Sequence, residues 1–451
     1  MILESLNNLF FDLLFIIINF LLFLLLFVAY KKLKNYFGNN ILLKFIFFFI
    51  NVKLVLYYLL PSLFRIYSSY QFEIEDHVKI FDLLRVYIIE LVSWIFWLLG
   101  FVIILIIKGN SIKSNDQILT QNFKESKHLL LIFAIGSIIQ TFYSISLNTP
   151  NIIFSLFGQL FFYAGLSVGP ILLLFSKRLY NKFYLLVGLI CFSLSLLSLS
   201  TRGAFVYSIL FLTFIIFFII RSQKAKFAFI FILSMLIIAF IFSGSVINRV
   251  SIDENGLNFI PKEISEKSDG RTFAQEIEWR FGASTRIGTG FLVMYDEGLR
   301  AGINPIKHSL LGFLPRSIDP NKPHPSTLDG QDFFSQGMYL IMAKVEGNPT
   351  SMVEFPTGCH FYWEFGTLGV IILSIISGIY IGACYILFKK FGLVSIPLML
   401  STFKPWGYVE PKIWVSDIAM QLYQIIIPFI VLVFFYRLIQ MVLNLKFKKI
   451  V

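Results

Sequence analysis

Charged residues are scarce in this chain. Asp, Glu, Lys and Arg make up 14% of its 451 residues, whereas 57% are hydrophobic, and the mean hydropathy is +0.78. A single soluble core cannot bury that much apolar surface, so the composition excludes an ordinary soluble domain. We expect an integral membrane protein in which one long polar interval, 248–365, interrupts the apolar pattern.

Cysteines and familiar catalytic motifs are also few. Only Cys359 of the three cysteines lies outside a predicted span, so no structural disulfide is expected. The sequence has no G-x-x-x-x-G-K-[ST] or strand-linked G-x-G-x-x-G motif, and no H-E-x-x-H, paired C-x-x-C or G-x-S-x-G motif. These absences exclude the common nucleotide, zinc-protease, zinc-ribbon and hydrolase sites, and we expect no cofactor and no metal site.

Long apolar windows recur along almost the whole chain. A bilayer core needs about 20 apolar residues per helix, and backbone amides that face lipid must be paired within a helix. The expected fold is therefore an all-α polytopic membrane protein of about eleven transmembrane helices with one large extracytoplasmic loop that contains short helices. The predicted spans are 9–30, 41–63, 86–107, 128–147, 152–175, 183–200, 204–220, 227–247, 366–388, 393–410 and 417–437.

Basic residues form short clusters between these spans. The net charge is +12, but no single basic patch indicates a nucleic-acid partner, and none is expected. The first span lacks a basic leader and an A-x-A-like site, and Lys31, Lys32 and Lys34 follow it, so we expect it to be retained with its N-terminus outside. With alternating sides, every inner loop is basic, and the interval 248–365 lies on the outer face.

This topology divides the chain into three regions. An N-terminal membrane region covers 1–247, the large outer loop covers 248–365, and a C-terminal membrane region with a basic cytoplasmic tail covers 366–451. Apolar residues at helical spacing predict one or two amphipathic helices in 272–299, lying against the membrane face, and a short one is expected at 333–345.

Arginines are concentrated on the predicted outer face. The planar guanidinium suits phosphate oxygens, although exposed arginines also pair with local acids, here Glu276, Glu278, Asp296 and Glu297, or with lipid head groups. Arg202 stands apart because it occupies a three-residue turn between two spans, where solubility needs no charge. The outer set is Arg202, Arg249, Arg271, Arg280, Arg286, Arg300 and Arg316, with Lys322 nearby.

A second cluster leads into the ninth span. Glu354, His360 and Glu364 lie beside aromatic residues at this predicted membrane boundary, where titratable groups can be tuned for proton transfer. The alternative is structural: Tyr362 and Trp363 would form an aromatic belt, and His360 would cap the helix.

Ionisable residues also occur inside spans. Lys44 and Lys53 fall in the second span and Glu90 in the third. Snorkelling or a Lys53–Glu90 pair explains them more simply than a transport pathway, because no span has a dense set of polar residues or a pair of broken helices.

Three motifs together resemble the O-antigen polymerase family of oligosaccharide repeat-unit polymerases. Ser200-Thr-Arg-Gly203 is similar to the family's S/T-R-G turn between two spans, and the stretch from Gly312 to Pro323 resembles its outer-loop "PR…KP" segment. The stretch from Pro356 to Gly369 resembles the family's entry into the following helix. In one departure, His360 stands where these polymerases often have glutamate, so His360, Glu364 or Glu354 would handle the proton.

The resemblance implies a reaction on the outer face of a bacterial cytoplasmic membrane. A glycan on undecaprenyl pyrophosphate would be transferred to a single lipid-linked repeat unit, so both substrates are lipid-linked oligosaccharides. The implied partners are the membrane, a flippase and a chain-length regulator. The implied site has catalytic His360, Glu364 and Arg280 and the pyrophosphate-binding residues Arg202, Arg286, Arg316 and Lys322.

Three alternatives remain open. A glycan ligase shares the many spans, the outer loop and the lipid pyrophosphate donor. A metal-dependent lipid-phosphate-sugar transferase could use the acidic residues Glu73, Glu75 and Asp76 of the first outer loop. A transporter or flippase of lipid-linked glycans would move its substrate without lengthening it, and would not need an outer loop of this length.

Overall fold

The computed structural model forms two compact units. The first comprises Met1–Thr120, Thr272–Ser395 and Thr402–Ile427, and the second comprises Gln121–Arg271, Ile396–Ser401 and Pro428–Val451. The residues described are 2–37, 47, 51, 54–63, 80–109, 118–146, 157–158, 160–161, 164–165, 168–169, 171–172, 182–197, 250–253, 256–259, 288–298, 300–311, 356–391, 418 and 421–448.

Four helical segments are long and apolar enough to cross a membrane, which confirms a helical membrane protein. They are Leu13–Lys34 in α1 (Ile2–Phe37), Asp82–Ile107 in α4 (Ile80–Gly109), Thr357–Leu387 in α13 (Thr357–Phe391), and Leu422–Val442, formed by η3 (Leu422–Ile426) and α16 (Ile427–Lys448). They match the predicted spans 9–30, 86–107, 366–388 and 417–437. The other seven predicted spans lie partly or wholly outside the described residues, so the number eleven remains a prediction.

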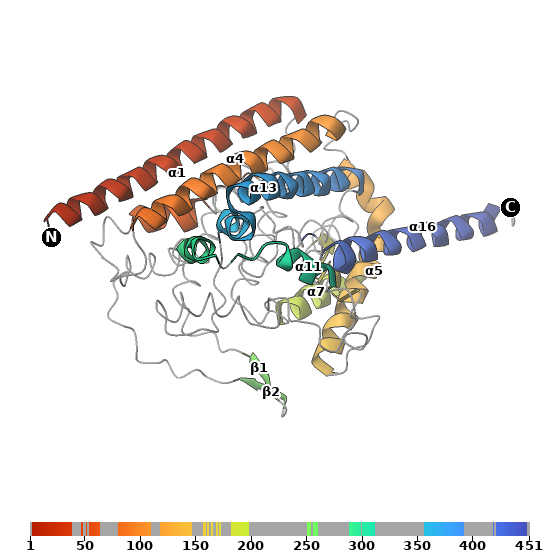
Figure 1. The fold of residues 1–451 in the computed structure, drawn as a ribbon. Helices are drawn as coiled ribbons and strands as arrows, with labels where there is room; N and C mark the ends of the chain where they lie inside the picture. The colour runs from red at the N-terminus through yellow and green to blue at the C-terminus, as the bar shows by residue number, and fades with distance from the viewer. Residues whose placement is uncertain are drawn as a thin grey trace, which may run out of the picture. The chain divides into compact units, whose positions relative to one another are not determined.

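Aromatic contacts show how the first three predicted spans follow one another in the first unit. Helices α1 and α4 lie side by side (Figure 1), and Phe15 stacks on Tyr87 with ring centroids 4.4 Å apart. Tyr58 meets the same Tyr87 edge-on at 5.6 Å, whereas Phe47 lies 5.4 Å from Tyr30, near the far end of α1. Phe47 and Tyr58 therefore lie near opposite ends of α1.

Helices α4 and α13 pack closely and in parallel. A Cβ atom added at Gly378 would overlap the carbonyl oxygen of Trp97, and one at Gly382 would overlap the side chain of Ile104. Small residues at such points let helix backbones approach closely in a membrane. Because the contacts advance together along both helices, α4 and α13 run in the same direction.

The second unit contains helices and one short sheet. Helix α5 (Ile118–Ser146) meets α16 where Phe133 stacks on Phe429 at 6.2 Å, and α7 (Lys182–Leu197) lies between these helices in the sequence. Strands β1 (Val250–Asp253) and β2 (Gly256–Phe259) form an antiparallel hairpin that the all-α expectation did not include. Apolar residues alternate with polar ones in both strands, a period-two pattern within the predicted outer loop.

Part of the predicted outer loop belongs to the first unit. Residues 288–296 are helical and lie within the predicted amphipathic stretch 272–299, and α11 (Asn304–Leu311) follows after a short turn. Phe291, Leu292 and Met294 are buried on the helix 288–296. The predicted helix 333–345 lies outside the described residues.

Candidate functional site

Helix α13 is divided by a backbone break within the Pro356–Gly369 motif. Phe365 and Gly366 have non-helical dihedral angles, and Gly366 has φ 64° and ψ −150°. Only glycine adopts this region readily, and a Cβ here would also overlap the hydroxyl of Tyr295. The break separates a short helix, 357–364, from the long membrane span, and Figure 1 shows the two parts along different directions.

The short helix 357–364 is held at its C-terminal end by the turn after helix 288–296. The backbone N–H of Ala301 donates a hydrogen bond to the carbonyl of Trp363 at 3.3 Å, and that of Gly302 donates to Glu364 at 3.1 Å. The last carbonyls of a helix have no partner within the helix, so these two bonds satisfy them. The predicted outer loop thus contacts the predicted membrane entry directly.

Glu90 of α4 holds the other end of the short helix. Its Oε1 accepts a hydrogen bond from the backbone N–H of Cys359 at 3.1 Å, and Glu90 itself is 2% exposed. The first N–H groups of a helix lack internal partners and attract negative charge. The expected Lys53–Glu90 pair lies outside the described residues, because Lys53 is not among them.

His360 and Glu364 lie one turn apart and face each other. The distance from His360 Nδ1 to Glu364 Oε1 is 3.5 Å, somewhat longer than an ordinary hydrogen bond, and both residues are buried. The backbone N–H of His360 donates to the carbonyl of Pro356 within the helix. His360 therefore does not cap the helix, and its ring stands beside a carboxylate.

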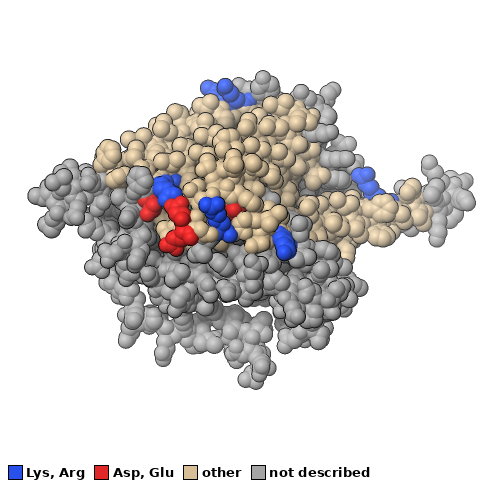
Figure 2. Space-filling model, viewed as in Figure 1, with Lys and Arg blue, Asp and Glu red and all other residues tan. Residues whose placement is uncertain are grey.

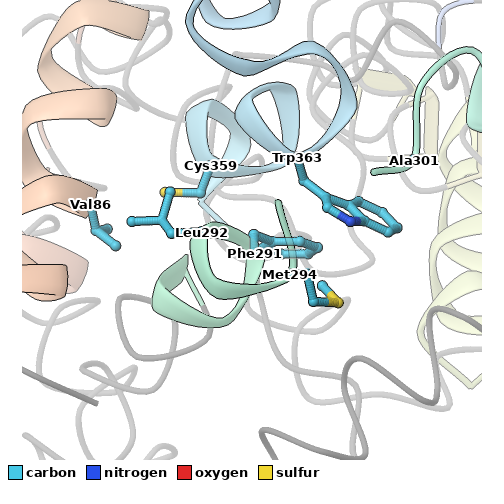
Figure 3. Close-up of a cluster of buried hydrophobic side chains, with 7 residues drawn as sticks. All are labelled: Val86, Phe291, Leu292, Met294, Ala301, Cys359 and Trp363. Carbon is cyan, nitrogen blue, oxygen red and sulfur yellow. The ribbon is translucent and has the colours of Figure 1, made fainter. Parts of the chain in front are cut away.

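Aromatic rings enclose the imidazole. The centroid of His360 lies 5.7 Å from that of Phe291 and 5.6 Å from that of Trp363, both edge-on. Figure 3 shows Phe291 and Met294 of the helix 288–296 facing Cys359 and Trp363 of the short helix. Trp363 is buried in this cluster, so it does not belong to a lipid-facing aromatic belt.

A charged group lies where α4 meets the helix 288–296. Arg85 donates to both carboxylate oxygens of Asp296, at 2.8 and 3.3 Å, and lies 3.4 Å from Asp82 and 3.5 Å from the hydroxyl of Tyr362. Figure 2 shows basic and acidic side chains gathered beside a broad surface without charge. The Arg85–Asp296 pair is partly exposed, with 29% and 46% of the side chains accessible, so it contributes at most about 1 kcal/mol.

The structure brings together two of the predicted site residues, His360 and Glu364. Arg280 and the proposed pyrophosphate-binding residues, Arg202, Arg286, Arg316 and Lys322, lie outside the described residues. The role of Glu90 at the short helix was not anticipated. A carboxylate within an apolar span was the available signal, but its partner, Cys359, is 269 positions away in the sequence.

No cluster of three His, Cys, Asp or Glu side chains that could hold a metal occurs within the described part of the chain. The acidic residues Glu73, Glu75 and Asp76 of the metal-dependent alternative lie outside it. Comparisons with protein-family models, with curated proteins and with solved structures give no match for this chain. The resemblance to the O-antigen polymerase family therefore depends on the three sequence motifs.

Proposed function

We propose that this membrane protein is a glycosyltransferase that polymerises undecaprenyl-pyrophosphate-linked oligosaccharide repeat units. The observation that supports this function best is the buried His360–Glu364 pair at the start of a membrane span, with Nδ1 and Oε1 3.5 Å apart. A base with an adjacent orienting carboxylate is the arrangement that a transfer to a sugar hydroxyl requires.

His360 acts as the general base in this proposal. Glu364 faces Nδ1 and orients the ring, so Nε2 takes the proton from the acceptor hydroxyl. The hydroxyl oxygen forms a bond to the anomeric carbon of the donor glycan as the bond from that carbon to the pyrophosphate oxygen breaks. The lipid pyrophosphate leaves with the bonding electrons, and the glycan is longer by one repeat unit.

Access to the base requires a local movement. His360 is only 1% exposed, so a neighbouring side chain must move before an acceptor hydroxyl can reach the imidazole. Phe291 is one such neighbour, and it belongs to the helix 288–296 rather than to the short helix. Exclusion of water from the closed site would protect the activated donor from hydrolysis.

The developing charge on the leaving group needs cations. We assign this role to Arg202, Arg286, Arg316 and Lys322, with Arg280 at the reacting centre, on the outer face of a bacterial cytoplasmic membrane. The donor and acceptor reach the site through the lipid phase. A flippase supplies the repeat units, and a chain-length regulator is a further expected partner.

The arginine assignment is tested by Arg202→Ala and Arg316→Ala in a strain that lacks the chromosomal gene. We expect each variant to shorten or abolish the polysaccharide ladder, with transfer lowered at least about 100-fold, because each removes a positive charge that stabilises the leaving pyrophosphate. Arg85→Ala is the matched control, since Arg85 already pairs with Asp296. Full-length ladders from correctly inserted Arg202→Ala and Arg316→Ala proteins would exclude the phosphate-binding role.

A further inference from the structure

The carboxylate of Glu90 and the short helix 357–364 approach each other unusually closely. A Cβ added at Gly358 would lie 2.7 Å from Glu90 Oε1 and 2.8 Å from Ser93 Cβ, so only glycine leaves room for the carboxylate at this helix end. The hydrogen bond from Cys359 N–H to Glu90 is a second, independent sign of the same contact.

The contact joins a membrane span to the helix that presents the proposed base. Glu90 is a residue of α4, and His360 follows Cys359 directly in the short helix. Beyond the break at Gly366, a separate hydrogen bond, Ser93 Oγ to Ser374 Oγ at 2.8 Å, joins α4 to the long part of α13. Each part of α13 is therefore joined to α4 by a separate hydrogen bond.

We infer that Glu90 is a positioning residue, whose carboxylate anchors the N-terminal end of the short helix and so fixes the place of His360. The first N–H groups of a helix attract negative charge, so a carboxylate is a better partner for the Cys359 N–H than the neutral amide of glutamine. The catalytic part of this inference rests on the proposed function, whereas the anchoring does not.

Cysteine labelling measures the anchoring without any assay of activity. Cys359 is fully buried in the short helix, and Cys191 and Cys384 are also buried. In membranes containing the full-length protein with Cys191→Ser and Cys384→Ser, a maleimide should label Cys359 slowly. We expect Glu90→Gln to raise this labelling rate about tenfold, because a charge-assisted contact is replaced by a weaker neutral one.

Two further variants define the contact. Gly358→Ala should raise Cys359 labelling in the same way, although alanine normally favours a helix, because its Cβ displaces the carboxylate. Ser93→Ala is the matched control: it removes a buried α4–α13 hydrogen bond beyond the break, and Cys359 should stay protected. Unchanged labelling of Cys359 in Glu90→Gln would overturn the inference.

A second protein, in which Cys384 is the one remaining cysteine, distinguishes loss of the Glu90 anchor from general unfolding. Cys384 lies in the long part of α13 and should remain protected in Glu90→Gln. Equal exposure of Cys384 and Cys359 would show that the substitution unfolds the helix pair, and the positioning role would be lost.

Kinetics on lipid-linked repeat units test the link to His360. Glu90→Gln should lower kcat about tenfold and leave KM within about twofold, because the base is displaced while the substrate-binding groups are intact. Faster labelling of Cys359 with an unchanged kcat would overturn the positioning of His360. If the wild-type protein lengthens no glycan, the proposed function fails, and the labelling result still decides whether Glu90 anchors the helix.

Discussion

Replacement of His360 by glutamine should lower the rate of repeat-unit transfer at least about 100-fold, the usual contribution of a general base. Glutamine keeps a polar group of similar size beside Glu364 but cannot accept the proton. The variant should accumulate single lipid-linked repeat units, seen by electrophoresis of the polysaccharide and by mass spectrometry of the lipid extract.

The matched control for this substitution is His128→Gln. His128 is an exposed histidine of α5, so its loss should leave the ladder unchanged. Both proteins must be present in the membrane at wild-type amounts, because His360 is buried and a misfolded variant would also be inactive. A normal ladder from His360→Gln would exclude the histidine as the base.

Replacement of Gly378 by leucine should destabilise the membrane bundle by about 3 kcal/mol, near the upper end of overpacking effects. The new side chain would meet the backbone carbonyl of Trp97 and the backbone nitrogen of Phe101, which cannot turn aside as a side chain can. The two helices must separate, and the Ser93–Ser374 hydrogen bond should be lost with their packing.

The measurement is unfolding of the purified protein in mixed micelles with increasing denaturing detergent. Ile376→Leu serves as the control, because Ile376 is 38% exposed on a neighbouring face of the same helix. We expect the control to unfold close to the wild-type midpoint. An unchanged midpoint for Gly378→Leu would contradict the close parallel packing of α4 and α13.

The sequence predicts these spans well because a helix that crosses the hydrocarbon core of a bilayer needs about 20 predominantly apolar residues. The windows 9–30, 86–107 and 366–388 fall within α1, α4 and α13. Their helix ends are predicted less well. Helix α1 begins at Ile2 and ends at Phe37, beyond both ends of the window 9–30, because backbone hydrogen bonding continues through polar residues that apolar counts exclude.

The candidate site was predictable only in part. His360 and Glu364 were predicted as titratable residues at the entry to the ninth span, and the structure places His360 Nδ1 and Glu364 Oε1 3.5 Å apart. Sequence spacing could not reveal the partner of Glu90, because that contact depends on how two distant spans pack. It also could not show that the helix is interrupted at Gly366, since glycine permits this backbone conformation but does not require it.

Lipid-linked glycans in a strain that lacks this gene provide the most direct test of the proposed function. The glycans would be extracted with the carrier lipid, released and sized by mass spectrometry, with and without the wild-type gene on a plasmid. We predict single repeat units on undecaprenyl pyrophosphate without the gene and a polymer with it. Full-length polymer on the carrier lipid in the absence of the gene would contradict polymerisation and indicate a ligase.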